Sequence, residues 1–384
     1  MVCDWVATAS ATIQTDAQRP IPEPMIWHSF VSTAMYNAVV GIQGRYAPYK
    51  WTARGPRSAS PAAAAAAAAH RVLLTYFPAS KSRLQAAYAA SLAKIPDGRA
   101  KDQGVAFGQR AADHIITTRK GDGRSARVVF AARPAPGVWR PTPTAHEPFS
   151  SAWMGKLRPM LLTSPGQFRP GGPPKLTSAR YAKDVTEVKA FGSKSGSKRS
   201  PEQTDTARFF SGALSTQEAL CDYAARHRFG IAATARLLAA ANTTTADAVI
   251  TAWDSKIHYR SWRPITAIRL ADTDGNPKTV PDRAWEPLLR TPAHPEYLSG
   301  HATTAGAFMR ALTEILGTSR VDLSITSQAT GSTRHYTYAD QYNRDVINAR
   351  VWGGIHFRSA DTVGNDTGQR LASWALARYF RPLR

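Results

Sequence analysis

Apolar residues recur at helical spacing along most of the chain. Within residues 28–42, for example, Phe30, Ala34 and Ile42 fall near one face of a helix. Eight consecutive alanines at 62–69 add a high helix propensity to the next segment. Patterns of this kind predict helices at 28–42, 62–77, 82–95, 100–119, 244–259, 300–316 and 364–380.

Two regions interrupt the helical pattern. Residues 132–175 are rich in Pro and Gly and show no helical period, so we expect a lid or a substrate-covering loop there. Residues 192–205 form a basic, Ser-rich stretch that we interpret as a solvated loop rather than a phosphate site. Helical character returns from about Ala207, and few segments alternate as strands do. The pattern predicts an all-α fold, a helical bundle with long Pro- and Gly-rich loops.

The length and composition fit one folded unit. The chain has 384 residues, of which 43% are hydrophobic and 20% are charged, which is enough apolar surface for a sizeable core. We expect a single domain over residues 1–384. Within it, residues 1–206 would supply N-terminal helices and covering loops, and residues 207–384 a C-terminal helical bundle that carries the chemistry.

The charge balance is strongly basic. The chain holds 49 Lys and Arg against 27 Asp and Glu, a net charge of +22. Such an excess favours an anionic partner: nucleic acid, an acidic membrane surface, phosphate or another oxyanion. An Arg-rich composition with a merely basic surface is an equally good interpretation. We expect no nucleic-acid partner, because no nucleic-acid-binding motif is present and the positive charge is scattered.

Targeting and redox signals are sparse. No apolar run approaches the ~20 residues that span a bilayer, so we expect a soluble protein without a membrane span. Residues 1–16 lack a basic leader followed by an apolar core, so no signal peptide is visible. The sequence is compatible with export to the extracellular space and with a homo-oligomer. The two cysteines, Cys3 and Cys221, allow one disulfide bridge at most and provide no metal-type pair.

Three short segments in the C-terminal half carry the candidate chemistry. Each holds a cationic side chain, a histidine or both, and the middle segment opens the helix predicted at 300–316. Taken alone, each segment is better explained as a helix cap, a turn or a surface charge. The segments KIHYRSWRP, SGH and NARVWGGIHF contribute Lys256 and Arg263, then Ser299, Gly300 and His301, then Arg350 and His356.

Together these residues suit a tetrahedral oxyanion. Lys and Arg side chains neutralise its charge, and Arg presents a planar fork to adjacent oxygens. Gly300 lets the backbone approach closely, Ser299 adds a hydroxyl group, and the positive end of the helix dipole lies there. One of the two histidines can bind the central atom while the other moves protons.

The order and spacing of these motifs resemble the vanadium-dependent haloperoxidase family. Lys-x6-Arg-Pro, Ser-Gly-His and Arg-x5-His follow one another within residues 256–361. The upstream stretches AMYNAVVGIQGRYAPY and PEQTDTARFF are similar to the bacterial branch of the family. The three motifs are specific for the wider type 2 phosphatidic acid phosphatase superfamily. The resemblance implies an all-α bundle of the vanadium haloperoxidase and acid phosphatase type.

The resemblance also implies a role for each residue. His356 would be the nitrogen ligand of vanadate, and His301 would be the general acid–base on the apical side. The bound vanadate would accept hydrogen peroxide and oxidise a halide to hypohalous acid, which halogenates a small organic substrate. Lys256 would polarise the peroxide for halide attack. The equatorial oxygens of vanadate would be held by Lys256, Arg263, Ser299, the Gly300 N–H and Arg350.

Two flanking residues bear on the choice of halide. Trp253 matches an aromatic residue near the halide region of the family, and core packing explains it nearly as well. His294 stands where fungal chloroperoxidases resemble one another in having Phe and algal bromoperoxidases in having His. His294 therefore favours bromide over chloride as the substrate. An equally good interpretation is that His294 is an ordinary surface or turn histidine.

The chain departs from the superfamily pattern at two positions. Ala349 precedes the Arg of the third motif, where phosphatases usually carry Ser. Ala360 stands four residues after His356, where phosphatases and fungal peroxidases usually carry Asp. Asp361 is one place further on, displaced by about a quarter turn of a helix. The residue that orients His356 is therefore not identified by the motif.

The second hypothesis is a soluble acid phosphatase or phosphotransferase that uses the same site. Vanadate mimics the transition state of phosphoryl transfer, so one oxyanion site can serve both reactions. His356 would be the nucleophile and His301 the leaving-group acid. The displaced Asp puts phosphotransfer in doubt, because in phosphatases that Asp orients the nucleophilic histidine.

Overall fold

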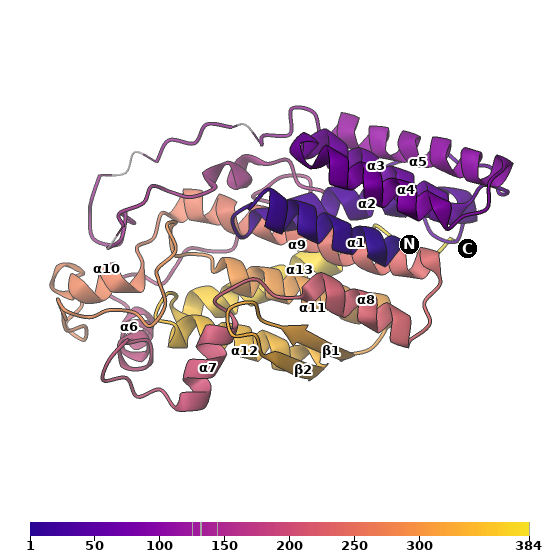
Figure 1. Ribbon diagram of the computed structural model, residues 1–384. Coiled ribbons are helices and arrows are strands. Elements are labelled where there is room, and N and C mark those ends of the chain that lie inside the picture. The colour runs from indigo at the N-terminus through magenta and orange to yellow at the C-terminus, as the bar shows by residue number, and fades with distance from the viewer. Residues whose placement is uncertain (125, 131–132, 144, 384) are drawn as a thin grey trace.

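Helices dominate the computed structural model, which describes residues 1–124, 126–130, 133–143 and 145–383 (Figure 1). This confirms the prediction of a mostly helical bundle. Within these ranges, no helix combines the length and the apolarity needed to cross a membrane. The α-helices are α1 (Val2–Ser10), α2 (Glu23–Gln43), α3 (Pro61–Tyr76), α4 (Lys81–Ala93), α5 (Arg99–Thr118), α6 (Ala179–Phe191), α7 (Pro201–Phe209), α8 (Thr216–Arg226), α9 (Ile231–Tyr259), α10 (Pro264–Arg269), α11 (Gly300–Leu316), α12 (Ala339–Trp352) and α13 (Arg358–Leu376).

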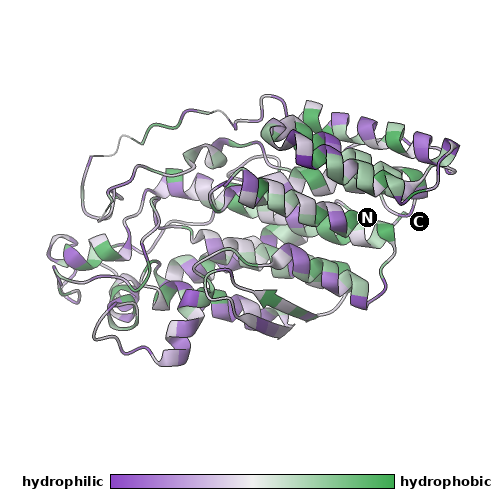
Figure 2. Ribbon diagram, in the orientation of Figure 1, coloured by the Kyte–Doolittle hydropathy of each residue, from purple (hydrophilic) through white to green (hydrophobic). Residues whose placement is uncertain are grey.

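Helix α9 is the central element. It is 29 residues long and is buried along most of its length, as far as Lys256. Helices α2 and α11 pack on it, and α11 packs in turn on α13, while α3 and α5 form an outer layer over α2 (Figure 1). One apolar cluster joins α1, α2, α3, α9 and α11. Along the outer helices α5 and α8, apolar and polar residues alternate, as expected for helices with one buried face (Figure 2).

Small residues let α11 and α13 approach closely. A Cβ atom on Gly306 of α11 would collide with the backbone carbonyl of Asn365 in α13. A Cβ on Gly368 of α13 would collide with the backbone carbonyl of Thr303 in α11. Because the two helices are locked at this short separation, the first turn of α11, where the Ser-Gly-His motif lies, is fixed against α13.

The prediction of a loop over 192–205 is wrong at its C-terminal end. Helix α7 begins at Pro201, inside the predicted loop. The Ser200 hydroxyl accepts from the Gln203 N–H, and the Gln203 side chain accepts from the Ser200 N–H, which is a capping box. Pro at the first helical position is favourable as well. These local signals start the helix before the apolar period becomes visible.

A single β-hairpin departs from the all-helical expectation. Strand β1 (Arg320–Thr326) pairs antiparallel with β2 (Thr333–Tyr338), and this is the only sheet in the described part of the chain. Val321, Leu323 and Ile325 alternate toward the core. Three alternating residues are too short a pattern to separate a strand from a loop in the sequence.

The Pro- and Gly-rich stretch is irregular, as predicted. Within residues 133–143 and 145–175, the structure describes one regular element, the short helical turn η3 (Ala152–Lys156). This turn packs on α9. Residues 132 and 144 of the predicted loop lie outside the described residues. The other short turns of the chain are η1 (Ala11–Asp16), η2 (Pro78–Ser80) and η4 (Ala271–Thr273).

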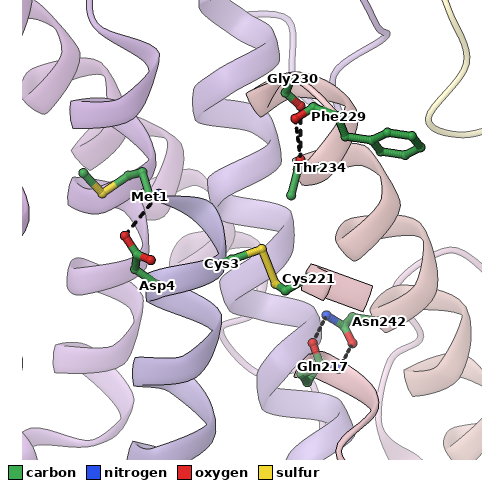
Figure 3. Close-up of a disulfide and its surroundings, with 9 residues drawn as sticks. All are labelled: Met1, Cys3, Asp4, Gln217, Cys221, Phe229, Gly230, Thr234 and Asn242. Atoms are coloured by element: carbon green, nitrogen blue, oxygen red, sulfur yellow. Dashed lines mark hydrogen bonds and ion pairs between the residues drawn. A yellow bond between two sulfur atoms is a disulfide. The ribbon is translucent and has the colours of Figure 1, made fainter. Parts of the chain in front are cut away.

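A disulfide bridge joins α1 to α8, which settles the question that the sequence left open. Cys3 and Cys221 are 218 residues apart in the chain, and their Cα atoms are 5.7 Å apart (Figure 3). Both cysteines are thereby used, and no free cysteine is found. The bridge ties the N-terminal segment to the helix that follows α7.

We expect reduction of this disulfide to lower the free energy of unfolding by about 2–4 kcal/mol, since the bridge closes a long loop and restricts the unfolded chain. Urea denaturation with and without a thiol reductant measures the difference. The double variant Cys3→Ser/Cys221→Ser should match the reduced protein and should not respond to the reductant. Equal stability of the oxidised and reduced protein would contradict the prediction.

Candidate functional site

The three predicted segments converge near the C-terminal end of α9, around a cavity of about 430 Å³. Lys256, Arg263 and Ser299 lie behind its surface and are fully buried. Among the described residues, none from 133–175 lines this cavity, so the wall over it comes from other segments, including residues at the start of α2. The lining includes Trp253, His294, Gly300, His301, Arg350 and His356.

His356 is held in one orientation by a buried carboxylate. Its Nδ1 lies 2.9 Å from Oε1 of Glu296, and the N–H of Phe357 donates to the same oxygen at 3.0 Å. A carboxylate accepts, so Nδ1 carries the proton and Nε2 keeps its lone pair. Nε2 faces the Arg263 guanidinium, whose Nη1 is 3.1 Å away. Nε2 is therefore the atom of His356 that a ligand can reach.

Glu296 is the functional residue that sequence analysis missed. It lies in the segment PEYLSGH, five residues before His301, and is 1% exposed. Asp361, the displaced carboxylate of the motif, does not bond to His356, and neither of its carboxyl oxygens has a partner among the described residues. The only available signal was an acidic residue three positions before the Ser-Gly-His motif. Glu296 thus answers the question of what orients His356.

Arg263 connects the loop before α11 with the loop before α13. It caps the N-terminus of α10 with extended backbone, so its side chain leaves the helix toward the cavity. Nε donates to the His294 carbonyl at 2.7 Å and Nη1 to the Ile355 carbonyl at 2.7 Å. Nη2 donates to the Nδ1 of His294 at 2.7 Å. Burial lowers the pKa of Arg263 to about 9, so the guanidinium remains cationic at neutral pH.

Lys256 closes the loop that leads into the Ser-Gly-His motif. From the last turn of α9, its Nζ donates to the carbonyls of Pro295 at 2.8 Å and Glu296 at 3.0 Å, and to that of Leu298. An ammonium group has three donors, so this loop engages all of them. Burial, and then the neighbouring Arg263, lower the pKa of Lys256 well below its usual range. These bonds fix the loop, and a bound anion would favour the charged form of Lys256 that burial disfavours.

The Ser-Gly-His motif forms the first turn of α11. The Ser299 hydroxyl caps the helix by accepting from the Ala302 N–H at 3.4 Å. A Cβ on Gly300 would lie 3.0 Å from the Trp253 ring, so a larger residue would push this ring away. His301 lines the cavity, and burial followed by the charge of Arg350 lowers its pKa well below the usual range. His301 is therefore a neutral imidazole, able to accept a proton.

The site has an excess of positive charge and a donor without a partner. Arg350 donates from Nη1 to the Phe210 carbonyl at 2.8 Å, and its Nε is buried without a partner in the described part of the structure. Burial raises the pKa of Glu296 to about 7 and that of Asp361 well above its usual range, so Glu296 compensates part of the positive charge and Asp361 little of it. A tetrahedral oxyanion would supply both the negative charge and an acceptor for the Arg350 Nε. Vanadate therefore fits the residues present.

Trp253 and His294 form one wall of the cavity. Their rings pack with centroids 4.8 Å apart, and the Trp253 indole N–H donates to the Ser150 carbonyl at 3.3 Å. Trp253 also belongs to the main apolar core, so it serves as core and as wall at once. His294 lies in a bend, is partly exposed, faces this cavity and bonds Arg263.

Comparison with known proteins places this site in a known fold. Residues 236–384 match the family model of the VCPO second helical-bundle domain. No protein of curated function matches the sequence. A bacterial vanadium-dependent iodoperoxidase has a similar structure, with a TM-score of 0.83 and 23% identity over 98% of this chain and 95% of that chain. A holo-type bacterial vanadium-dependent chloroperoxidase is similar as well, with a TM-score of 0.73 and 19% identity over 91% of this chain and 90% of that chain. The C-terminal part of the chain thus matches the VCPO second helical-bundle domain model, and the chain as a whole has the fold of bacterial vanadium-dependent haloperoxidases.

Proposed function

We propose that this protein is a vanadate-dependent haloperoxidase, which uses hydrogen peroxide to oxidise a halide to hypohalous acid and so halogenates small organic substrates. One observation carries the proposal: the Nδ1 of His356 is held by the buried Glu296, which leaves Nε2 as the ligating atom among cationic side chains. The similarity in fold to bacterial iodo- and chloroperoxidases supports it.

In this proposal the oxygens of vanadate are held by the side chains around His356. His356 would ligate through Nε2, and the Nε of Arg350, which has no partner in the described part of the structure, would donate to one oxygen. Binding requires Arg263 to turn one guanidinium N–H from His356 to the anion. The remaining donors would be the Ser299 hydroxyl and the N–H of Gly300, and Lys256 would join them by turning one N–H from a loop carbonyl to the anion.

His301 moves the protons of the reaction. When bound, vanadate supplies a Lewis acid that activates hydrogen peroxide toward a halide. The neutral imidazole of His301 accepts a proton from the incoming peroxide and later returns it to the departing oxygen as water forms. The Lys256 ammonium withdraws electron density from the peroxide oxygens. Trp253 and the buried lining limit the access of bulk water.

We propose bromide as the preferred halide, with chloride as the harder alternative. His294 and Trp253 would form the wall against which the halide approaches. The Arg263 guanidinium that bonds His294 keeps positive charge beside that wall, which attracts a halide ion. Iodide is the most easily oxidised of the three ions. A protein that oxidised iodide but not bromide would therefore contradict the preference for bromide.

The test is halogenation of a phenolic dye by purified protein with hydrogen peroxide and bromide, chloride or iodide in turn. Each reaction is run with orthovanadate and after its removal by dialysis against a chelator. Vanadate-dependent bromination supports the proposal. Halogenation that does not depend on vanadate, or none with any halide, would reject it.

The acid phosphatase hypothesis keeps one argument in its favour. The displaced Asp spoke against phosphotransfer, yet Glu296 supplies the carboxylate that a nucleophilic histidine needs. His356 would then attack phosphorus through Nε2, with His301 protonating the leaving group. Hydrolysis of p-nitrophenyl phosphate that is inhibited by vanadate would show this reaction in the same site.

We expect Lys256→Ala to retain vanadate binding but to lose halide oxidation by about 100-fold, because the ammonium acts mainly on the reacting peroxide. Vanadate affinity by equilibrium dialysis and kcat for bromide oxidation check the two parts separately. Thermal unfolding serves as the control, since the variant also frees the carbonyls of Pro295 and Glu296. An unchanged kcat would contradict the role of Lys256.

A further inference from the structure

A second cavity adjoins the anion site. Its volume is about 130 Å³, and we call it the His28 cavity after the buried histidine of α2 in its lining. His301 lines both cavities, so the proton-transferring residue stands at the boundary between them. The residues common to the two linings are Ile21, Pro22, Met25, His301 and Thr304.

The lining of the His28 cavity is mainly apolar and aromatic. Two of its three amide side chains satisfy each other: Gln217 Nε2 donates to Asn242 Oδ1 at 2.6 Å, and Asn242 Nδ2 donates to Gln217 Oε1 at 3.1 Å (Figure 3). The third, Gln14, is partly exposed. Because Gln217 and Asn242 are paired, they hold α8 against α9 rather than face a ligand. Apolar side chains in the lining are Met25, Leu214, Phe308, Tyr342 and Val346.

His28 differs from the other polar side chains of this lining in having a buried atom without a partner in the described part of the structure. Its Nε2 is buried and has no hydrogen-bond partner in the described residues. Burial lowers the pKa of His28 to about 4, so the ring is neutral at neutral pH. A buried polar atom without a partner is costly, and a ligand group that completes the hydrogen bond removes this cost.

We propose that the His28 cavity binds a single-ring phenol, whose hydroxyl group bonds to His28 and whose ring receives the oxidised halogen. The cavity is close in size to an engineered protein cavity of about 150 Å³ that binds benzene. A mainly apolar lining in which one buried polar atom lacks a partner among the described residues matches one ring with one hydroxyl. This inference rests on the proposed function for its source of oxidised halogen.

The halogen transfer balances with the products of the proposed reaction. At the anion site, the halide attacks one peroxide oxygen and the O–O bond breaks, so that hydrogen peroxide, halide and one proton give hypohalous acid and water. A carbon–halogen bond then forms at a ring carbon ortho or para to the phenol hydroxyl, and the halogen–oxygen bond breaks. The oxygen leaves as hydroxide and takes the ring proton, which gives water. Because the two cavities adjoin at His301, the acid has a short path to a bound ring.

Binding is tested first, without peroxide or halide. Calorimetric titration of the purified protein with phenol and with benzene is expected to show both binding, phenol about tenfold more tightly. In His28→Leu the advantage of phenol over benzene should disappear. Ala213→Leu, which fills the cavity from the loop before α8, should weaken both ligands by more than about tenfold. Ala89→Leu adds the same group at an exposed position of α4 and should bind as the unchanged protein does.

Each outcome decides. Phenol binding that is absent from the unchanged protein, or is unaffected by Ala213→Leu, would overturn the proposal. Should Ala213→Leu fail to fold, Leu214→Trp fills the same cavity from the next residue. With bromide and peroxide, the unchanged protein should give an ortho-to-para ratio of bromophenol that differs from the ratio given by free hypobromous acid. In Ala213→Leu, whose cavity is filled, the ratio should equal that of free hypobromous acid. Phenol binding without halide oxidation would instead reject the proposed function and, with it, the ring's role as halogen acceptor.

Discussion

We expect the His356→Ala variant to bind vanadate at least ~100-fold more weakly than the unchanged protein and to lose halide oxidation. The loss of a residue that only supports a metal ligand typically costs about 10- to 100-fold in affinity, so the loss of the ligand itself should cost more. The cationic side chains would still attract the anion, but none of them offers a lone pair to vanadium. Equilibrium dialysis against orthovanadate measures the affinity directly, and bromination of a phenolic dye measures the activity.

The matched control for this variant is His335→Ala, an exposed histidine on β2. It should leave the affinity for vanadate and the activity unchanged. Thermal unfolding of both variants shows whether the fold persists, because His356 is buried and its removal frees Glu296. Halide oxidation at the normal rate in a folded His356→Ala protein would contradict the assignment of the ligand.

The candidate residues named from the sequence lie close together because each motif coincides with the end of a helix. Lys256 lies in the last turn of α9 and Arg263 caps α10. Ser299 caps α11, and Arg350 lies in the last turn of α12. Caps and last turns leave local signals, such as Ser before Gly or Arg before a pair of glycines. In a helical bundle, such ends gather at one place, so local signals were enough to find the group.

Glu296 could not be found in this way. It contacts His356 across 60 residues of chain, and it sits in a loop without a period or a helix end. The motif pointed instead to a carboxylate after His356, where the chain has Ala360 and Asp361. The contact exists because Lys256 and Arg263 fold the loop before α11 against the loop before α13. Only the packing of these two loops defines it.

The His28 cavity was hidden for a similar reason. Its walls come from the start of α2, the loop before α8 and the helices α9, α11 and α12. Within α2, His28 is one residue of an almost wholly buried helix, and its sequence context gives no sign of a ligand. A cavity is a defect of packing between distant segments, so a hydrophobic pattern that predicts each helix does not predict the space left between them.

The second large effect that we expect concerns Glu296. In Glu296→Ala, the Nδ1–H of His356 and the N–H of Phe357 both lose their acceptor. The imidazole is then no longer fixed in the tautomer that exposes Nε2, and the affinity for vanadate should fall by roughly 10- to 100-fold. Equilibrium dialysis gives the affinity, and nitrogen NMR of the imidazole gives the tautomer of His356 before vanadate is added.

Two variants separate the charge of Glu296 from its geometry. Glu296→Gln keeps a carbonyl oxygen that accepts from both donors, so it should hold His356 in place and lose less affinity than Glu296→Ala. Glu286→Ala removes a half-exposed carboxylate from a surface ion pair with Lys194 and should change neither affinity nor tautomer. These comparisons cancel the general effect of removing one negative charge from a basic protein.

A purely structural role for Glu296 predicts a different result. Two buried donors without an acceptor destabilise the fold by about 1–3 kcal/mol each, which urea denaturation would detect in Glu296→Ala. If that loss of stability occurs while the affinity for vanadate and the His356 tautomer stay unchanged, Glu296 only holds the loop. If the affinity for vanadate and the His356 tautomer change together, and Glu296→Gln restores both in part, the Glu296 carboxylate positions His356. The reason is that loop stability alone does not select which ring nitrogen carries the proton.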